Sequence, residues 1–336
     1  MKEKKRLKLG RNRLVAFSLA AIIAVGIGNV TASARTYEIQ ESSMESRGFE
    51  SFWDSLLNNS DQNTENGDSV INVDRYNKAL ATVANKNVNA YTRKSIVISG
   101  RETSIKGITV NGIEYIPFRQ SANIIGGSYI YNSKTGNSTL TSPGLTLSAT
   151  SGNYVVYAND RPLFSTSPTL IMNDGRMYIP AEIFAKAVGM RMSVSSGSVS
   201  LSGSYSPLKS ASEYYRSDEV LWLARIIHAE SRGEPLLGQV AVGNVVLNRV
   251  KSSSYPNTIY GVIFDRKYGV QFSPVLDGTI YNTPSYNSTL AAKICLEGFD
   301  ISEGALFFLR PEMSTSSWIP NNRPYSFSIG KHDFYK

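Results

Sequence analysis

The stretch from residue 220 to residue 250 reads VLWLARIIHAESRGEPLLGQVAVGNVVLNRV, and it decides how the C-terminal part of this 336-residue chain folds. Four of its residues lie three or four positions apart, namely Val220, Leu223, Ile227 and Glu230. An α-helix places all four on one stripe, of which three members are apolar and the last is a carboxylate. The pattern therefore predicts a helix that turns Glu230 towards the protein core.

Glu230 is predicted to lie in the last turn of that helix. Gly233 is placed to end the helix, and Pro235 suits the first turn of a second helix over residues 236–250. In a last turn the helix dipole disfavours an anion, and apolar neighbours disfavour it further. Both effects raise the pKa of the carboxyl group, and a glutamate that is protonated near neutral pH can act as a general acid. The alternative is a solvated glutamate at a helix end, which spacing alone favours.

Several motifs follow one another in the last third of the chain. They are AESRGEP (229–235), GQVAVGNVVLNRV (238–250), YPNTIYGVIF (255–264), QFSPVLDG (271–278), GALFFL (304–309) and IGKHDFY (329–335). Together they resemble the cell wall hydrolase family typified by the SleB spore cortex-lytic enzymes. The resemblance implies a lysozyme-like, mainly helical α+β catalytic domain over residues 217–336 that acts on peptidoglycan glycan strands, with Glu230 as the acid/base.

A glycosidic bond is cleaved when an acid protonates the leaving oxygen, and a hydrolase needs a second carboxylate that attacks or holds a water molecule. The candidates for a second acid are Glu234, Asp265, Asp277, Glu297 and Glu303, and spacing selects none of them. The resemblance implies lytic transglycosylation instead, in which the muramic 6-hydroxyl attacks intramolecularly and one glutamate serves first as acid and then as base. One acid suffices for that route.

Six further residues are candidates for contacting the glycan, and for each the alternative is a structural role. Those that could hydrogen-bond to N-acetyl and hydroxyl groups are Asn248, Gln271 and Ser273. Those that could stack on a sugar face are Phe272 and Trp318. His332 matches the closing histidine motif of the family.

The formal net charge of +8 is concentrated at the N-terminus. Residues 1–34 hold seven Lys or Arg and one Glu, which accounts for six of these charges and leaves +2 for the rest, so a nucleic-acid partner is not expected. The basic start runs into an apolar segment, residues 14–27, and then Ala32-Ser33-Ala34, which is typical of a secretory signal peptide. We therefore expect export, to the cell wall or spore envelope. An uncleaved membrane anchor is the alternative, although the apolar run is short for a span.

Disulfide, metal and cofactor chemistry are not expected. Cys295 is the only cysteine, so no intramolecular disulfide can form, and it is predicted to be a buried small hydrophobe. The only histidines are His228 and His332, which leaves too few ligands for an ordinary zinc or copper site.

Two polar linkers and an internal repeat complete the predicted multidomain organisation. The linkers are residues 35–94 and 204–216. Between them, NGIEYIPFRQSANIIGG from Asn111 aligns with DGRMYIPAEIFAKAVGM from Asp174. Each copy predicts a strand ending in Tyr-Ile-Pro, a helix stopped by glycine and a small hairpin.

The repeat over residues 95–203 resembles the N-terminal domain family first described in copper amine oxidases, which implies an α+β stalk domain. This region contains no histidine, so we predict a non-catalytic module that acts as a spacer or contacts the wall, with glycan binding by its tyrosines left open. For the whole chain, the alternative to an enzyme is an inactive cell-wall-binding protein. A carboxylate on an apolar stripe costs stability if it does nothing, which favours the enzyme. The sequence does not separate spore cortex from vegetative wall as the substrate.

Overall fold

The computed structural model describes residues 91–267, 269–314 and 317–336. The predicted signal peptide and almost all of the predicted linker 35–94 lie outside these residues. The first strand, β1 (Thr92–Ile98), starts before the predicted domain boundary at residue 95. Within the described ranges, none of the helices has the length and apolar character that crossing a membrane requires.

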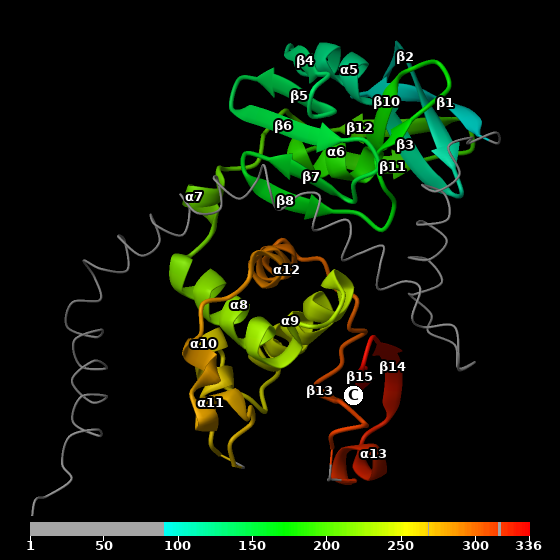
Figure 1. Ribbon diagram of the computed structural model, residues 1–336. Coiled ribbons are helices and arrows are strands. Elements are labelled where there is room, and N and C mark those ends of the chain that lie inside the picture. Colours follow the sequence, from blue (N-terminus) through cyan, green and yellow to red (C-terminus); the bar gives the residue numbers. More distant parts are fainter. Residues whose placement is uncertain (1–90, 268, 315–316) are drawn as a thin grey trace, which may run out of the picture. The chain divides into compact units, whose positions relative to one another are not determined.

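Two sheets make up the N-terminal region, residues 92–202 (Figure 1). The larger sheet contains β1, β2 (Arg101–Val110), β3 (Ile113–Pro117), β9 (Leu170–Ile171), β10 (Met177–Pro180), β11 (Arg191–Val194) and β12 (Ser198–Ser202). The smaller sheet contains β4 (Ser128–Asn132), β5 (Asn137–Ser142), β6 (Leu145–Thr150), β7 (Val155–Ala158) and β8 (Arg161–Phe164). The strand orders are β11-β12-β1-β2-β3-β10-β9 and β4-β5-β6-β7-β8.

The order strand, helix, hairpin occurs twice, at the two places where the repeat predicts it. The first copy runs from β3 through α5 (Phe118–Ser121) and the short 3-10 helix η2 (Ala122–Ile124) into the β4–β5 hairpin. The second runs from β10 through α6 (Ala181–Ala187) into the β11–β12 hairpin. The two Tyr-Ile-Pro strands pair antiparallel in the larger sheet, with Ile179 opposite Ile116. The duplication itself stays a prediction.

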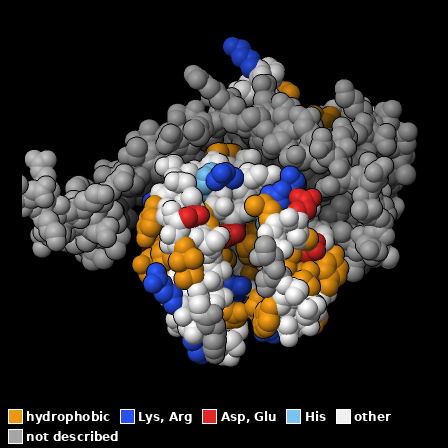
Figure 2. Space-filling view, turned by 60° about the horizontal axis from the view of Figure 1, so that its bottom comes forward, with side chains coloured by type: hydrophobic (Ala, Val, Ile, Leu, Met, Phe, Trp, Pro, Cys, Tyr) orange, Lys and Arg blue, Asp and Glu red, His pale blue; other side chains and the backbone are white. Residues whose placement is uncertain are grey.

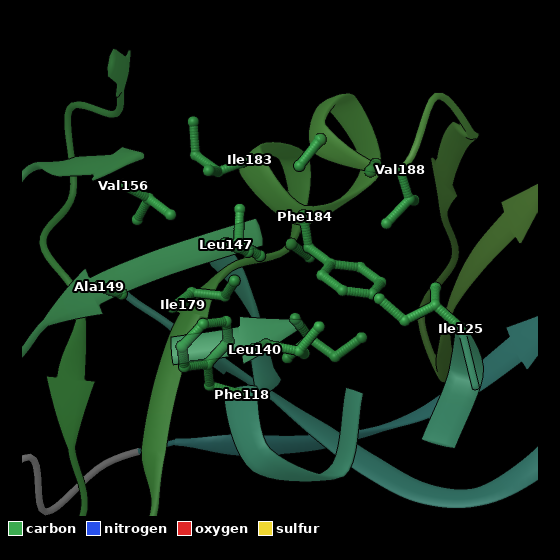
Figure 3. Packing of buried hydrophobic residues seen from close by; sticks show 14 of the residues in the cluster. Phe118, Ile125, Leu140, Leu147, Ala149, Val156, Ile179, Ile183, Phe184 and Val188 are labelled. Carbon is green, nitrogen blue, oxygen red and sulfur yellow. The ribbon is translucent and has the colours of Figure 1, made fainter. Parts of the chain in front are cut away.

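Both sheets contribute to one hydrophobic core (Figure 3). Phe184 of α6 and Phe118 of α5 lie among Leu140 and Leu147 of the smaller sheet and Ile179 of the larger one. Alternate positions of β6 are buried, as expected for a strand with one face on a core. The tyrosines of this region are partly buried and partly exposed. Tyr115, Tyr154 and Tyr178 are buried, so they cannot stack on sugars.

The predicted linker 204–216 is not structureless throughout, because it contains α7 (Ala211–Tyr214). Ser210 and Glu213 form a reciprocal capping box that satisfies free backbone donors of this single turn. The polar composition concealed a short helix, since the residues that cap a helix are the same ones that are common in linkers.

Three helices form the core of the C-terminal region: α8 (Ser217–Ser231), α9 (Leu236–Lys251) and α12 (Tyr286–Leu296), and each contacts the other two (Figure 1). They approach closely at Gly243, where an added Cβ would lie 2.7 Å from Sγ of Cys295 and 2.8 Å from Cδ1 of Ile227. Cys295 is buried, as predicted. The helix α12 begins at Tyr286, because Ser285 caps it by accepting a hydrogen bond from the backbone N–H of Ser288.

Short elements surround this three-helix core. They are α10 (Ile259–Ile263), α11 (Pro274–Asp277), the 3-10 helix η3 (Thr279–Tyr281), α13 (Trp318–Asn322) and a three-stranded sheet of β13 (Phe307–Leu309), β14 (Tyr325–Ile329) and β15 (His332–Tyr335). The sheet order is β13-β15-β14. The C-terminal segment therefore ends in a hairpin that pairs with the strand of the GALFFL motif.

Candidate active site

Glu230 lies in the last turn of α8 and is half-buried. The apolar members of its stripe, Val220, Leu223 and Ile227, are all buried, as the spacing predicts. Burial raises the pKa of Glu230 to about 7, the cation of Arg249 opposes this rise, and the charge of Asp277 adds to it. A carboxyl group with this pKa is protonated in about half of the molecules at neutral pH, which suits a group that must donate and then accept a proton.

Of the five second-acid candidates, Asp277 is the one whose charge raises the pKa of Glu230. It is exposed at the end of α11, where its Oδ1 accepts hydrogen bonds from the backbone N–H of Thr279 (2.8 Å) and from the Thr279 hydroxyl (2.6 Å). These bonds lower the pKa of Asp277. The site therefore combines an ionised carboxylate, Asp277, with a carboxyl group, Glu230, that keeps its proton to higher pH. Many acid/base pairs in enzymes have two pKa values that differ in this way.

Arg249 is the third charged group of this site, and the sequence reasoning above did not identify it. Its side chain is 5% exposed, near the end of α9, and burial lowers its pKa. The same signal that marks Glu230 marks Arg249, because Val242, Val246 and Arg249 share one stripe of α9 and both valines are fully buried. The helix dipole also favours a basic residue in a last turn, so the sequence alone does not mark Arg249 as a site residue.

The end of the molecule that carries α10, α11, α13 and β13–β15 is hollowed. Figure 2 turns this end forward and shows a groove between two lobes that are rimmed by hydrophobic side chains, with acidic and basic side chains along it. Exposed large hydrophobic side chains in these elements include Leu276, Trp318 and Tyr325. Such a rim suits the apolar faces of sugar rings.

Three polar residues were predicted to contact the glycan. The side chain of Asn248 is engaged within the protein, because its Nδ2 donates to Oγ of Ser302 (2.7 Å) and to the carbonyl oxygen of Ala305 (3.0 Å). This ties α9 to the loop before β13, so the structure favours the structural alternative for Asn248. Gln271 is half-buried and donates to the carbonyl oxygen of Gly269, and Ser273 is exposed at the start of α11. These two remain candidates.

The aromatic candidates divide. Trp318 is 52% exposed at the start of α13, where its ring lies 6.3 Å from that of Phe307 and 5.3 Å from the guanidinium carbon of Arg323, so it stays a candidate. Phe272 is 3% exposed and packs against Phe308, so the expectation that it stacks on a sugar is wrong. A motif shows where a ring lies in the chain but not which of its faces are already covered.

His332 is buried and has a structural environment. Its Nδ1 lies 3.7 Å from a carboxylate oxygen of Glu234, and its ring lies edge-on to Phe308 at 5.5 Å. Glu234 also accepts a hydrogen bond from the backbone N–H of Lys331 (2.9 Å). The pair joins the turn before α9 to the C-terminal hairpin, so the structure favours the structural alternative for His332 and removes Glu234 as a free second acid.

The other candidate second acids also have structural partners. Glu297 accepts two hydrogen bonds from Arg161 (2.7 and 2.9 Å), and Lys186 lies 3.2 Å from it. Asp265 accepts from the backbone N–H of Lys267, and Glu303 accepts from the hydroxyl of Ser326. Among the residues that the structure describes, no group of three or more His, Cys, Asp and Glu side chains is arranged to hold a metal ion.

Two protein families match the chain. Residues 97–202 match the copper amine oxidase N-terminal domain, and residues 233–335 match the cell wall hydrolase family. Glu230 lies three residues before the second matched segment. The chain therefore contains one segment similar to the copper amine oxidase N-terminal domain and a second similar to cell wall hydrolases.

The hydrolase part is similar to proteins named spore cortex-lytic enzyme. The relative from Bacillus cereus is 44% identical over 122 residues, which are 36% of this chain and 46% of the relative. The relatives from Halalkalibacterium halodurans and Bacillus subtilis are 41% and 40% identical over 120 residues, which are 36% of this chain and 35% and 38% of the relatives. The chain thus spans less than half the length of these relatives.

Two solved structures are also similar. One is the catalytic domain of the germination-specific lytic transglycosylase SleB from Bacillus anthracis, at 44% identity, covering 36% of this chain and 97% of that one with a TM-score of 0.34. The other is the catalytic domain of the Bacillus cereus SleB protein, at 44% identity, covering 36% of this chain and 92% of that one with a TM-score of 0.33.

Proposed function

We propose that this chain is an exported peptidoglycan-degrading enzyme that cleaves the MurNAc–GlcNAc bond of the glycan strand by lytic transglycosylation. Glu230 serves as the general acid and then as the general base. The observation that carries the proposal is the half-buried carboxyl group of Glu230, whose pKa is raised to about 7, directly before the segment that matches the cell wall hydrolase family. The names of the relatives point to spore cortex peptidoglycan as the substrate, and thus to a role in germination.

The chemistry needs one proton that is given and then recovered. Protonated Glu230 donates to the glycosidic oxygen, the bond between that oxygen and the anomeric carbon breaks, and positive charge develops on the ring. The muramic 6-hydroxyl attacks the anomeric carbon, and the carboxylate of Glu230 takes its proton. The products are a free hydroxyl on the leaving sugar and a 1,6-anhydro ring, and no water is consumed.

Asp277 has a different part in this proposal. Because hydrogen bonds from Thr279 keep it ionised, it raises the proton affinity of Glu230 and adds negative charge where the sugar becomes positive. Trp318, Gln271 and Ser273 are the proposed glycan contacts that remain accessible. The N-terminal domain is proposed to be a non-catalytic stalk, since it contains no histidine and three of its six tyrosines are buried in its own core.

Digestion of purified peptidoglycan tests the function. The secreted form of the full chain should lower the turbidity of a suspension of cortex peptidoglycan and release soluble fragments. Since the acid must carry its proton, the rate should fall as the pH rises above about 7, the pKa of Glu230. A parallel digestion of vegetative peptidoglycan shows which of the two substrates the protein cleaves faster. If the folded protein sediments with peptidoglycan but releases no fragments between pH 5 and pH 8, the proposed activity is wrong and the chain is a wall-binding protein.

A further inference from the structure

Arg249 is a buried cation that forms no ion pair with a carboxylate of the residues described. Its Nε donates to the carbonyl oxygen of Leu306 (2.8 Å), while its Nη1 is buried without a hydrogen-bond partner among the described residues. The guanidinium carbon lies 5.1 Å from the ring centres of Tyr255 and Phe272 and 5.6 Å from that of Phe307. We call these three rings the aromatic cage.

An arrangement of this kind costs stability. Removing a charge from water is costly, and the faces of aromatic rings compensate it less well than a hydrogen-bonded carboxylate does. Elsewhere the same chain buries an arginine differently: the side chain of Arg161 is 4% exposed and forms two hydrogen bonds to Glu297. Arg161 therefore has the carboxylate partner that Arg249 lacks among the described residues.

Glu230 is one of three groups that favour the charged form of Arg249, after Tyr255 and Asp265. The helices α8 and α9 pack against each other, and each group acts on the other: the Arg249 cation favours ionised Glu230, and the Glu230 carboxylate favours protonated Arg249. Tyr255 and Asp265 act on Arg249 in the same direction as Glu230. Glu230 is the one of these that loses and regains a proton in the proposed reaction.

We propose that Arg249 is a positioning residue for Glu230: fixed in the aromatic cage, its guanidinium stabilises the carboxylate that exists between the acid step and the base step. The inference rests on the proposed role of Glu230. When Glu230 gives its proton to the leaving oxygen, the new anion meets a cation that is already in place, so no water has to reorganise. The same cation also limits the rise in the pKa of Glu230, so the carboxyl group can still donate its proton.

A purely structural role is the competing explanation, because Arg249 also joins α9 to β13 through Leu306 and packs the three rings. That role predicts a loss of stability and no change in how activity depends on pH. The pH profile of kcat separates the two, since it reports the proton affinity of the acid in the enzyme–substrate complex.

The test compares Arg249→Met and Arg249→Lys with wild type in the full secreted chain acting on purified peptidoglycan. Loss of a neighbouring cation should move the fall in kcat to higher pH by about one unit. It should also lower the maximal kcat by roughly 10- to 100-fold with little change in KM, because the anion forms without its stabilising charge. Arg249→Lys keeps a cation at this position and should keep the fall closer to the wild-type pH than Arg249→Met does.

Arg225→Met is the matched control. Arg225 is also an arginine over an aromatic ring, with its guanidinium carbon 4.9 Å from the ring centre of Trp222 and a buried Nε without a partner in the described residues. Burial lowers its pKa as well, whereas the charges that shift the pKa of Glu230 are those of Arg249 and Asp277. This variant should leave the pH profile unchanged.

A folded Arg249→Met protein with the wild-type profile would overturn the inference, as would an equal shift in Arg225→Met. If Arg249→Met does not fold, Arg249→Lys decides: a fall in kcat displaced by a full unit contradicts the claim that the cation is what matters. Failure of the proposed function is a separate result, because it would show as an inactive wild type or an active Glu230→Gln protein.

Discussion

Glu230→Gln should abolish peptidoglycan cleavage and at the same time stabilise the protein above pH 7. General acid catalysis contributes roughly 10²- to 10⁴-fold, and glutamine has nearly the shape of glutamic acid but no proton to give. The folded-state pKa of about 7 lies above the ordinary value of 4.5, so the folded state binds more protons than the unfolded state between these values. Wild-type stability therefore falls as the pH rises from about 4.5 to 7.

Glutamine removes this penalty because it stays neutral. The free energy of unfolding of Glu230→Gln should exceed that of wild type at pH 8 by at most about 3 kcal/mol, and the difference should vanish near pH 4. Denaturant unfolding at the two pH values measures it. Glu303→Gln is the control, because it changes an exposed carboxylate and should leave both properties close to wild type. A Glu230→Gln protein that is inactive but less stable at pH 8 would show that the carboxyl group is not buried as described.

Arg161→Met should lower the free energy of unfolding by about 3–5 kcal/mol, because it leaves a buried carboxylate without its main partner. Burial raises the pKa of Glu297, but the hydrogen bonds from Arg161 and Tyr215 and the charge of Lys186 outweigh it, so the net pKa is lowered. The stability from this pair is present above the ordinary glutamate pKa and lost as the pH falls through the lowered value. The effect of Arg161→Met should therefore shrink in acid.

Lys106→Met provides the matched comparison, since it breaks the ion pair with Glu102 on the surface, where both side chains are at least half exposed. It should change the free energy of unfolding by less than about 1 kcal/mol. Replacing both members of the buried pair, Arg161→Met with Glu297→Met, should recover much of the loss, because no charge is then left unpaired. Equal effects of Arg161→Met and Lys106→Met would mean that Glu297 is hydrated and not structural.

The sequence predicted the position of Glu230 because its signal is local. A carboxylate at helical spacing behind three apolar residues needs only the geometry of one helix to be placed at the core. The strand, helix and hairpin of each repeat copy were predictable for the same reason, since their glycines and Tyr-Ile-Pro strands lie within short segments.

The rest of the site depends on contacts between distant segments, which no local pattern encodes. The aromatic cage takes Tyr255, Phe272 and Phe307 from three separate segments around one guanidinium. Similarly, the motif that contains His332 gave no sign that Glu234, almost a hundred residues earlier, lies 3.7 Å away. Sequence motifs named residues near the site, and tertiary contacts decided which of them are free to meet a substrate.

End-group analysis of the digested glycan tests the central claim most directly. If Glu230 alone serves as acid and base, fragments released from purified peptidoglycan by wild type should carry 1,6-anhydro-muramic ends, which mass spectrometry detects as the loss of one water relative to reducing ends. The Glu230→Gln protein should release none. Reducing ends from wild type would contradict the single-acid route and would assign the activation of water to a second carboxylate, for which Asp277 is the first candidate.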